Sequence, residues 1–310
     1  MIPGVRVCAV VVNWNGGEEN LACIESLLQQ GPELERIVFV DNASTDGSLE
    51  LVRARYPDLV YLVSTVNEGY GGGNNRGLRW ALEQGFDAML VVNNDVVLPP
   101  GQLALLVAAL SDASVGLVGP RVLKHEDPSR VWAAGGRLTW RQNLTTLRGN
   151  GQPDGPRWQA TAEVDYVVGC CLLVRRAVLE RAGFFDADFF AYTEDVDFGL
   201  RAGRAGFRAL CVGAARALHK ASSSTGGGYN PRRKYMMGVN SIWFLRRWAG
   251  PLQWLQFFVF DVLTLPFVFL LEVSRGRGKA AVAKGLGILD GLRGRRIDAD
   301  MLRAGWSRLW

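Results

Sequence analysis

Short apolar runs that end in polar residues alternate with helix-spaced stretches along the first 95 residues of the chain. Runs rich in β-branched side chains predict four strands, over residues 7–14, 36–44, 59–64 and 88–95. Apolar residues at helical spacing predict helices over 20–31 and 74–85. This alternation predicts an α/β fold with a mostly parallel sheet covered by helices.

Three of the predicted strands end on polar residues: Asn13, Asp41-Asn42 and Asn93-Asn94-Asp95. In open α/β sheets, ligands bind beyond the carboxyl ends of the strands. We therefore expect a binding site where these polar residues meet.

The pattern changes in the second half of the chain. Residues 120–165 are rich in Gly, Trp and Arg, and we expect short antiparallel strands and loops there. Residues 163–185 predict a buried strand and a helix, and a Gly/Ser loop at 222–228 precedes more helix.

The net charge of +5 lies in the C-terminal tail. Residues 241–310 hold 11 Lys and Arg against 5 acidic residues, whereas residues 1–240 hold 24 against 25. A neutral main domain argues against a nucleic-acid-binding face, and a basic tail suits an anionic membrane surface.

Residues 252–273 are very apolar, but Asp261 and Pro266 interrupt them, so we expect no clean 20-residue span. We interpret the segment as one or two helices lying in the membrane interface. The alternatives are helices packed on the main domain and a dimer interface.

The five cysteines are an odd number without CxxC spacing, which predicts reduced, mostly buried thiols and neither a zinc site nor a disulfide framework. The first residues run directly into an apolar β-type stretch without the pattern of a signal peptide. We expect a cytoplasmic chain.

Two strand-end carboxylates have both a structural and a functional interpretation. Asp41 begins a turn of small polar residues, where it either bonds its own backbone or reads a nucleobase edge or ribose hydroxyl. Asp95 either begins a turn before Pro99-Pro100 or holds Mg²⁺ or Mn²⁺ against a diphosphate.

The glycine-rich stretch "NEGYGGGNNRG", residues 67–77, opens a predicted helix. Backbone amides without Cβ atoms can approach a phosphate closely at such a place. The stretch matches neither the P-loop nor the dinucleotide-binding pattern, and a flexible loop is the alternative.

Residues 185–201, "FDADFFAYTEDVDFGLR", place five carboxylates among aromatic side chains. Thr193 can N-cap a helix whose first turn holds Glu194, Asp195 and Asp197, which complement the helix dipole. Alternatively, the aromatic wall raises a carboxylate pKa, as a general base requires. Of the two histidines, His125 and His219, the latter precedes the Gly/Ser loop, where it could act as a metal ligand.

Taken together, these stretches resemble the family 2 glycosyltransferases with the GT-A fold, and among them the rhamnosyltransferase-like subgroup. The likeness covers about residues 7–245 and depends on the order of six motifs: "VVVNWNG", "VDNASTDGS", "NEGYGGGNNRGL", "VVNNDVVLPP", "GCCLLVRRAVLERAGFFDADFFAYTEDVDFGLRAGRAGF" and "HKASSSTGG".

The resemblance implies a role for each matching residue. Asp195 corresponds to the base that deprotonates the acceptor, with Glu194 and Asp197 beside it, and Asp95 and His219 correspond to ligands of Mg²⁺ or Mn²⁺. The donor-binding residues implied are Asn13, Asn15, Asp41, Asn67, Gly72, Asn75, Asn94 and Asp95.

The resemblance also implies the substrates and the organisation of the chain. The donor is a nucleoside-diphosphate sugar, with dTDP-L-rhamnose preferred over UDP-sugars, and the acceptor is a glycan or lipid-linked hydroxyl in bacterial surface polysaccharide synthesis. Residues 1–245 form the GT-A domain, with a nucleotide-binding half to about 118 and an acceptor-binding half from about 119. Residues 246–310 form an amphipathic helical region, peripheral to the inner face of the cell membrane, and a homodimer is possible.

Two departures from the family pattern refine this expectation. The metal triplet reads Asn93-Asn94-Asp95, and the QxxRW signature of processive synthases is absent because Phe244 stands where the glutamine would be. The absence of this signature favours a single-addition enzyme over a polymerising synthase.

Two other classes remain as alternatives. A nucleotidyltransferase shares the sheet and the Mg²⁺, but it needs basic residues in the first loop, where "NWNGGEEN" is acidic. A non-catalytic membrane-bound scaffold is favoured by Asn93 and Asn94 and disfavoured by the intact Glu194, Asp195 and His219.

Overall fold

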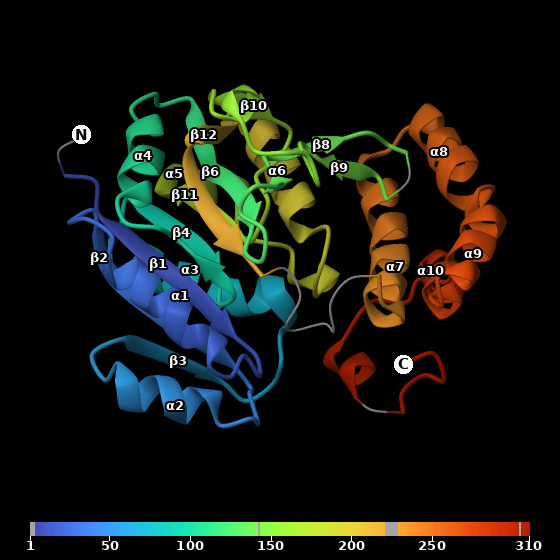
Figure 1. The fold of residues 1–310 in the computed structure, drawn as a ribbon, viewed down its shortest axis with the longest axis horizontal. Coiled ribbons are helices and arrows are strands. Elements are labelled where there is room, and N and C mark those ends of the chain that lie inside the picture. Colours follow the sequence, from blue (N-terminus) through green and yellow to red (C-terminus); the bar gives the residue numbers. More distant parts are fainter. Residues whose placement is uncertain (1–3, 142, 221–228, 304) are drawn as a thin grey trace.

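A computed structural model describes residues 4–141, 143–220, 229–303 and 305–310 of the chain. A central sheet with helices on its faces forms the main body of the molecule, and helices α7 to α10 stand beside it (Figure 1). The order of the main strands across the sheet is β10-β12-β6-β11-β4-β1-β2-β3, with β5 paired to β12 and β7 paired to β6. The β1–β2, β2–β3, β1–β4 and β6–β12 pairs are parallel, whereas β11 is antiparallel to both of its neighbours.

The strands of the described chain have the following bounds: β1 Val7–Asn13, β2 Leu34–Asn42, β3 Val60–Ser64, β4 Ala88–Asn93, β5 Val96–Val97, β6 Val115–Lys124, β7 Val131–Ala133, β8 Gly136–Leu138, β9 Thr145–Leu147, β10 Ala162–Val164, β11 Cys171–Arg175 and β12 Arg208–His219. The α-helices are α1 Glu19–Leu28, α2 Ser48–Arg55, α3 Gly69–Glu83, α4 Gln102–Ala109, α5 Arg176–Ala182, α6 Glu194–Arg204, α7 Pro231–Trp248, α8 Pro251–Phe257, α9 Leu265–Ser274 and α10 Gly278–Leu292. Short helical turns are η1 Pro156–Trp158, η2 Ala187–Phe189 and η4 Ala299–Leu302, and η3 Phe258–Val262 is a π-helix.

The sheet is covered on both faces, as the buried, apolar strands predict. Along β1, Val7, Ala9 and Val11 pack in one core cluster with α1, α2 and α4, whereas Cys8 and Val10 pack in another with α3, α5 and α6. The predicted α/β fold with a mostly parallel, helix-covered sheet is confirmed. All five cysteines are buried free thiols, as predicted.

The polar strand ends meet at one edge of the sheet. Asn13 pairs with Asp41 across β1 and β2, and Val12 pairs with Asn93 across β1 and β4. Because parallel strands end at the same edge, the residues that follow them lie side by side. The sequence-based expectation of a gathering of polar residues is therefore confirmed.

The glycine-rich stretch is part of a helix, which differs from the prediction that helix begins near residue 74. Helix α3 begins at Gly69, and its glycines lie close to the sheet. A Cβ atom on Gly77 would lie 2.3 Å from Cγ1 of Val10, and one on Gly73 would lie 2.8 Å from Cγ1 of Val12. These glycines therefore permit close packing of α3 on β1, and they do not form a flexible loop.

The C-terminal helices are docked on the rest of the chain through α7. Helix α10 crosses α7 at glycines on both sides: a Cβ on Gly287 would lie 2.2 Å from the carbonyl oxygen of Tyr235, and one on Gly238 would lie 2.5 Å from that of Lys284. Residue 245, the predicted domain boundary, lies inside α7. The division into 1–245 and 246–310 stays a prediction.

Residues Pro251–Ser274 form one helical stretch of 24 residues that is long and apolar enough to cross a membrane, with 17% of its most apolar window buried. The expectation that Asp261 and Pro266 leave no such span is wrong. Pro266 lies in the first turn of α9, where its missing N–H leaves no helical hydrogen bond unmade. Asp261 is buried and forms an ion pair with Lys284 of α10.

Candidate active site

A cavity of about 510 Å³ opens at the carboxyl ends of β1 and β4. Its wall comes from the strand ends, the start of α3, the segment before α6 and the α7 helix. Among the residues predicted from the sequence, those that line it are Asn67, Asn94, Asp95, Glu194, Asp195 and His219. The structure therefore brings together residues that are up to 152 positions apart, from Asn67 to His219.

The Asp95 and His219 side chains meet in this cavity. Asp95 follows β4, and His219 is the last residue of β12, which pairs with β5 at Val96. His219 Nε2 lies 3.2 Å from Asp95 Oδ1, and both side chains are 7% exposed. The indole of Trp132 packs edge-on against the imidazole, with the ring centroids 4.5 Å apart.

This pair fits a divalent cation that shares its coordination with a substrate. One carboxylate and one imidazole are suitable donors for Mn²⁺ and, less ideally, Mg²⁺. Within the described residues, no group of three or more His, Cys, Asp or Glu side chains could hold a metal ion. The remaining coordination positions would therefore be filled by water and by oxygens of a bound diphosphate.

Asp195 is the second residue of α6, and its carboxylate is fixed by two backbone donors. The N–H of Gly169 donates to Oδ2 at 3.0 Å, and the N–H of Val196 donates to Oδ1 at 2.9 Å. Burial raises the pKa of Asp195 above its ordinary value, although these hydrogen bonds oppose the shift. A carboxylate in this position suits a general base.

Glu194 lies beside Asp195 in a different environment. Its side chain is buried, and Oε2 has no hydrogen-bond partner among the described residues. Burial, and secondly the charge of Asp195, raise the pKa of Glu194 well above its ordinary value. Glu194 therefore favours the protonated form, in which its O–H is a donor toward the cavity.

Tyr70 and Gly169 position the Asp195 carboxylate, and the sequence did not single them out. The Tyr70 hydroxyl donates to the carbonyl oxygen of Gly169 at 2.6 Å, and the N–H of the same residue holds Asp195. A Cβ on Gly169 would lie 2.8 Å from the Tyr70 hydroxyl oxygen, so only glycine fits without a shift. The tyrosine stands within the "NEGYGGG" stretch, whose aromatic residue was the available signal.

The segment before α6 has a strained backbone. Phe190, Tyr192 and Thr193 have φ angles of 60°, 70° and 78°, in the left-handed region that costs a non-glycine residue about 1 kcal/mol or more. The side chain of Asn240 in α7 holds this segment: Nδ2 contacts the carbonyl oxygens of Phe189, Ala191 and Tyr192 at 2.8–2.9 Å. Thr193 occupies the N-cap position of α6, as predicted, but its backbone is left-handed and its side chain makes no capping hydrogen bond.

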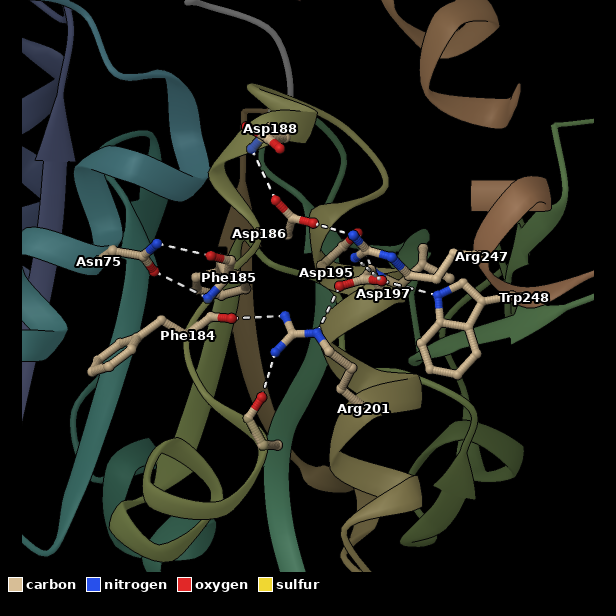
Figure 2. Close-up of polar contacts among 12 residues, drawn as sticks. Asn75, Phe184, Phe185, Asp186, Asp188, Asp195, Asp197, Arg201, Arg247 and Trp248 are labelled. Atoms are coloured by element: carbon tan, nitrogen blue, oxygen red, sulfur yellow. Dashed lines mark hydrogen bonds and ion pairs between the residues drawn. The ribbon is translucent and has the colours of Figure 1, made fainter. Parts of the chain in front are cut away.

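Asp197 is fully buried and does not line the cavity. It accepts hydrogen bonds from Arg201 Nε at 2.8 Å, Arg247 at 2.9 Å and the Trp248 indole at 2.9 Å (Figure 2). Arg247 also pairs with Asp186 at 2.6 Å. Asp197 therefore joins α6 to the end of α7, and its expected role beside Asp195 stays a prediction.

The residues predicted to read the nucleotide form a hydrogen-bonded group beside the cavity. Asn13 Nδ2 donates to Asp41 Oδ1 at 2.9 Å and also contacts the Ser44 and Ser48 hydroxyls. Asp41 is 2% exposed, and Asn15 accepts from the N–H of Thr45 at 2.8 Å. None of Asn13, Asn15 and Asp41 lines the cavity, and their contact with a nucleotide stays a prediction.

Of the predicted donor-binding residues on α3 and just before it, one lines the cavity and two do not. Asn67 lines the cavity, where its Oδ1 accepts hydrogen bonds from Asn42 and from the N–H of Gly69. Asn75 lies outside the cavity and exchanges two hydrogen bonds with the backbone of Phe185 (Figure 2). Gly72 is buried within α3 and also lies outside the lining. Contact of Asn75 and Gly72 with a donor stays a prediction.

Comparison with solved structures shows the class of fold. The chain is similar to the mannosyltransferase PcManGT from Pyrobaculum calidifontis, solved in complex with GDP-Man and Mn²⁺, with a TM-score of 0.59, 18% identity and coverage of 94% of this chain and 88% of that one. It is also similar to GalNAc-T7 with UDP, GalNAc and Mn²⁺, with a TM-score of 0.61, 14% identity and coverage of 83% and 54%. The fold is that of the GT-A glycosyltransferases.

Sequence comparison shows the family. Residues 8–183 match Glycosyl transferase family 2. The chain is 31% identical over 271 residues to the N-acetylglucosaminyl-diphospho-decaprenol L-rhamnosyltransferase of Mycobacterium tuberculosis, covering 72% of this chain and 85% of the relative. It is 28% identical over 198 residues to the low-salt glycan biosynthesis hexosyltransferase Agl10 of Haloferax volcanii, covering 63% and 61%. The chain belongs to glycosyl transferase family 2, which confirms the resemblance found in the sequence.

Proposed function

We propose that this glycosyltransferase moves a sugar from a nucleoside-diphosphate donor to a hydroxyl of a glycan or lipid-linked acceptor, with inversion at the transferred carbon. The observation that carries the proposal is the single cavity lined by both the Glu194-Asp195 pair and the Asp95–His219 pair. The preferred donor is dTDP-L-rhamnose, followed by UDP-sugars, in bacterial surface polysaccharide synthesis. The rhamnosyltransferase name of the mycobacterial relative supports this preference.

The two pairs supply the two elements that an inverting displacement needs. Asp195 accepts the proton of the acceptor hydroxyl. The hydroxyl oxygen attacks the anomeric carbon as the bond from that carbon to the diphosphate breaks. Glu194, in its protonated form, donates a hydrogen bond toward the acceptor. When bound at Asp95 and His219, Mg²⁺ or Mn²⁺ neutralises charge on the departing diphosphate. The Mn²⁺ in the two similar solved structures supports this choice.

The proposal includes attachment to the inner face of the cell membrane. Leu252, Phe267 and Leu270 on the α8–α9 stretch are 62%, 73% and 66% exposed. Asp261 and Glu272 on the same stretch are buried and paired with cations of the protein. A helix held at these two points favours an interfacial position over a crossing. A homodimer through the same face is the alternative, and flotation with anionic liposomes separates the two.

A thermal-unfolding panel tests the donor and the metal. The protein is mixed with UDP, dTDP, GDP or CMP and their common sugars, each with Mn²⁺, Mg²⁺ or EDTA. A ligand that binds the folded state raises the melting temperature, and at 100 times its Kd it stabilises by about 2.7 kcal/mol. We expect a shift for dTDP or UDP compounds that requires the metal and that His219→Ala removes. Flat curves for every nucleotide contradict the proposal.

A further inference from the structure

A second cavity, of about 360 Å³, lies against the first. Asn143 and Lys234 line both cavities. The other side of the second cavity comes from α9, through Leu265, Val268 and Leu271. The space therefore lies between the candidate active site and the exposed apolar helix.

Positive charge exceeds negative charge in this cavity. Its lining holds four cations, Lys234, Lys284, Arg275 and Arg277, and two carboxylates, Asp261 and Glu272. Lys284 pairs with Asp261, and both arginines pair with Glu272, at 3.1 Å and 2.7 Å. Both carboxylates are therefore paired within the lining. Four cations against two carboxylates leave an excess of two formal positive charges.

Lys234 has no ion pair among the described residues. Its ammonium lies 4.3 Å from the centroid of the Tyr229 ring, and Arg277 stacks on the same ring with its guanidinium carbon 5.0 Å from the centroid. Burial, followed by the charges of Lys284 and Arg233, lowers the pKa of Lys234 to about 8. A bound anion would offset both effects and favour the charged form of Lys234 further.

The chemistry of the pocket and the surface beside it match one kind of ligand. Lysine and arginine side chains around a small cavity bind phosphate groups through charge-assisted hydrogen bonds. Basic pockets between membrane-facing helices are sites for lipid headgroups. Beyond the pocket, α8 and α9 expose apolar side chains on which an acyl or polyprenyl chain can lie.

We propose that the second cavity binds the phosphate or diphosphate headgroup of a membrane-embedded lipid acceptor, with the lipid chain along the exposed face of α8 and α9. The acceptor sugar then enters the first cavity past Asn143 and Lys234, toward Asp195. This inference rests on the proposed function and adds to it the residues that recognise the acceptor's anionic group.

Vesicle flotation of the full chain tests the inference without a transfer assay. The vesicles are phosphatidylcholine alone, phosphatidylcholine with a polyprenyl diphosphate, and phosphatidylcholine with phosphatidylglycerol at equal charge. We expect the polyprenyl diphosphate to increase binding beyond both other vesicles. Lys234→Gln and Arg277→Gln should each weaken that increment roughly tenfold, the loss of one charge-assisted contact.

Two further variants control the result. Lys279→Gln removes an exposed charge at the start of α10, outside the second cavity, and should leave the increment unchanged. Lys234→Arg keeps the charge and should retain most of the increment. In Arg277→Gln, Arg275 remains to pair with Glu272, so its melting temperature should stay close to that of the unmodified chain.

Three outcomes overturn the inference. The first is equal binding to the two anionic vesicles or an equal loss in Lys279→Gln, which means attraction to surface charge alone, or equal binding to all three vesicles, which means apolar attachment without headgroup recognition. The second is stabilisation by inorganic pyrophosphate through Lys234 without any increment on vesicles, which means a site for a free anion. The third is an increment that none of the cavity variants changes.

The nucleotide panel separates this inference from the proposed function. A metal-dependent nucleotide shift without a vesicle increment removes the lipid site and leaves the glycosyl transfer. A vesicle increment sensitive to Lys234 without any nucleotide shift removes the proposed donor chemistry and leaves the lipid site.

Discussion

At the scale of single residues, neighbouring acids at the start of α6 have different surroundings. Asp195 accepts two backbone hydrogen bonds, whereas Oε2 of Glu194 has none within the described residues. Hydrogen bonds to a carboxylate favour its ionised form, and burial without them favours the neutral acid. These different surroundings suit the two roles that we propose, with Asp195 as the base and Glu194 as a hydrogen-bond donor.

Glu194→Gln should make the folded state more stable at neutral pH. The raised folded pKa of Glu194 means that folding takes up a proton once the pH exceeds about 4.3, the unfolded pKa. This component of stability is present below that pH and is lost as the pH rises toward the folded pKa, with a slope of up to about 1.4 kcal/mol per pH unit. Glutamine has no such component.

Urea unfolding of the unmodified chain and of Glu194→Gln, from about pH 4 to about pH 7, measures the difference in their free energy of unfolding. The range begins near the ordinary Glu pKa of about 4.3. The stability advantage of the glutamine variant should grow with pH. An advantage that is constant with pH, or a loss that grows with pH, contradicts the assigned protonation of Glu194.

Single residues also show where the sequence was sufficient. The positions of Asp95, His219 and Asp195 in one cavity agree with their motifs, because Asp95 follows a strand, His219 ends one and Asp195 lies in the first turn of a helix. The partners of Asp197 could not be predicted, since Arg247 and Trp248 lie 50 and 51 residues further along the chain. The hydrogen bonds of Asn75 could not be predicted for the same reason, because Phe185 is 110 residues away.

At the scale of elements, α7 organises the site from outside the sheet. Asn240 holds the strained segment before α6, and Arg247 holds Asp197 and Asp186. The other face of α7 packs on α10 through glycines. Helix α7 therefore joins the C-terminal helices to the segment that carries Asp195, and Arg296 adds a direct ion pair with Asp188.

Gly287→Ala tests this joint. The added Cβ would lie 2.2 Å from the Tyr235 carbonyl oxygen, so α10 must shift from α7, at a cost of about 1–3 kcal/mol. Gly203→Ala in α6 is the matched control, because no atom lies within 4 Å of its added Cβ. The control should gain up to about 1 kcal/mol from helix propensity.

Thermal unfolding of the two variants gives the comparison. A lower melting temperature for Gly287→Ala and an equal or higher one for Gly203→Ala support the close crossing. If Gly287→Ala unfolds at the temperature of the unmodified chain, the helices do not pack as described.

The elements also show which patterns were readable from the sequence. The four strands before residue 95 agree with the prediction within two residues at each end. Apolar runs bounded by polar turn residues define these strands from the local sequence alone. Helix α3 begins five residues before its predicted start, because glycine has low helix propensity and packing against β1 overrides it. The apolar stretch was misjudged at Asp261, whose buried partner Lys284 is 23 residues away.

At the scale of the whole molecule, the two cavities and the exposed apolar stretch lie in sequence from the sheet edge to the outer helices. Figure 1 shows α8 and α9 on the side of α7 away from the sheet. The donor chemistry would therefore take place at the sheet, and the acceptor would arrive from the side of the C-terminal helices.

The central claim is that Asp195 is the base of a glycosyl transfer. Asp195→Asn keeps the shape of the side chain and removes its ability to accept the proton. We expect sugar transfer, measured as release of the nucleoside diphosphate in the presence of acceptor, to fall by about 10²–10⁴-fold.

Sugar transfer and the thermal shift with nucleotides are both measured for Asp195→Asn. Asp58→Asn, which changes an exposed acid outside the cavity, is the control. The account predicts that Asp195→Asn loses transfer and retains the metal-dependent nucleotide shift, while the control retains both. Full transfer by Asp195→Asn would contradict the account.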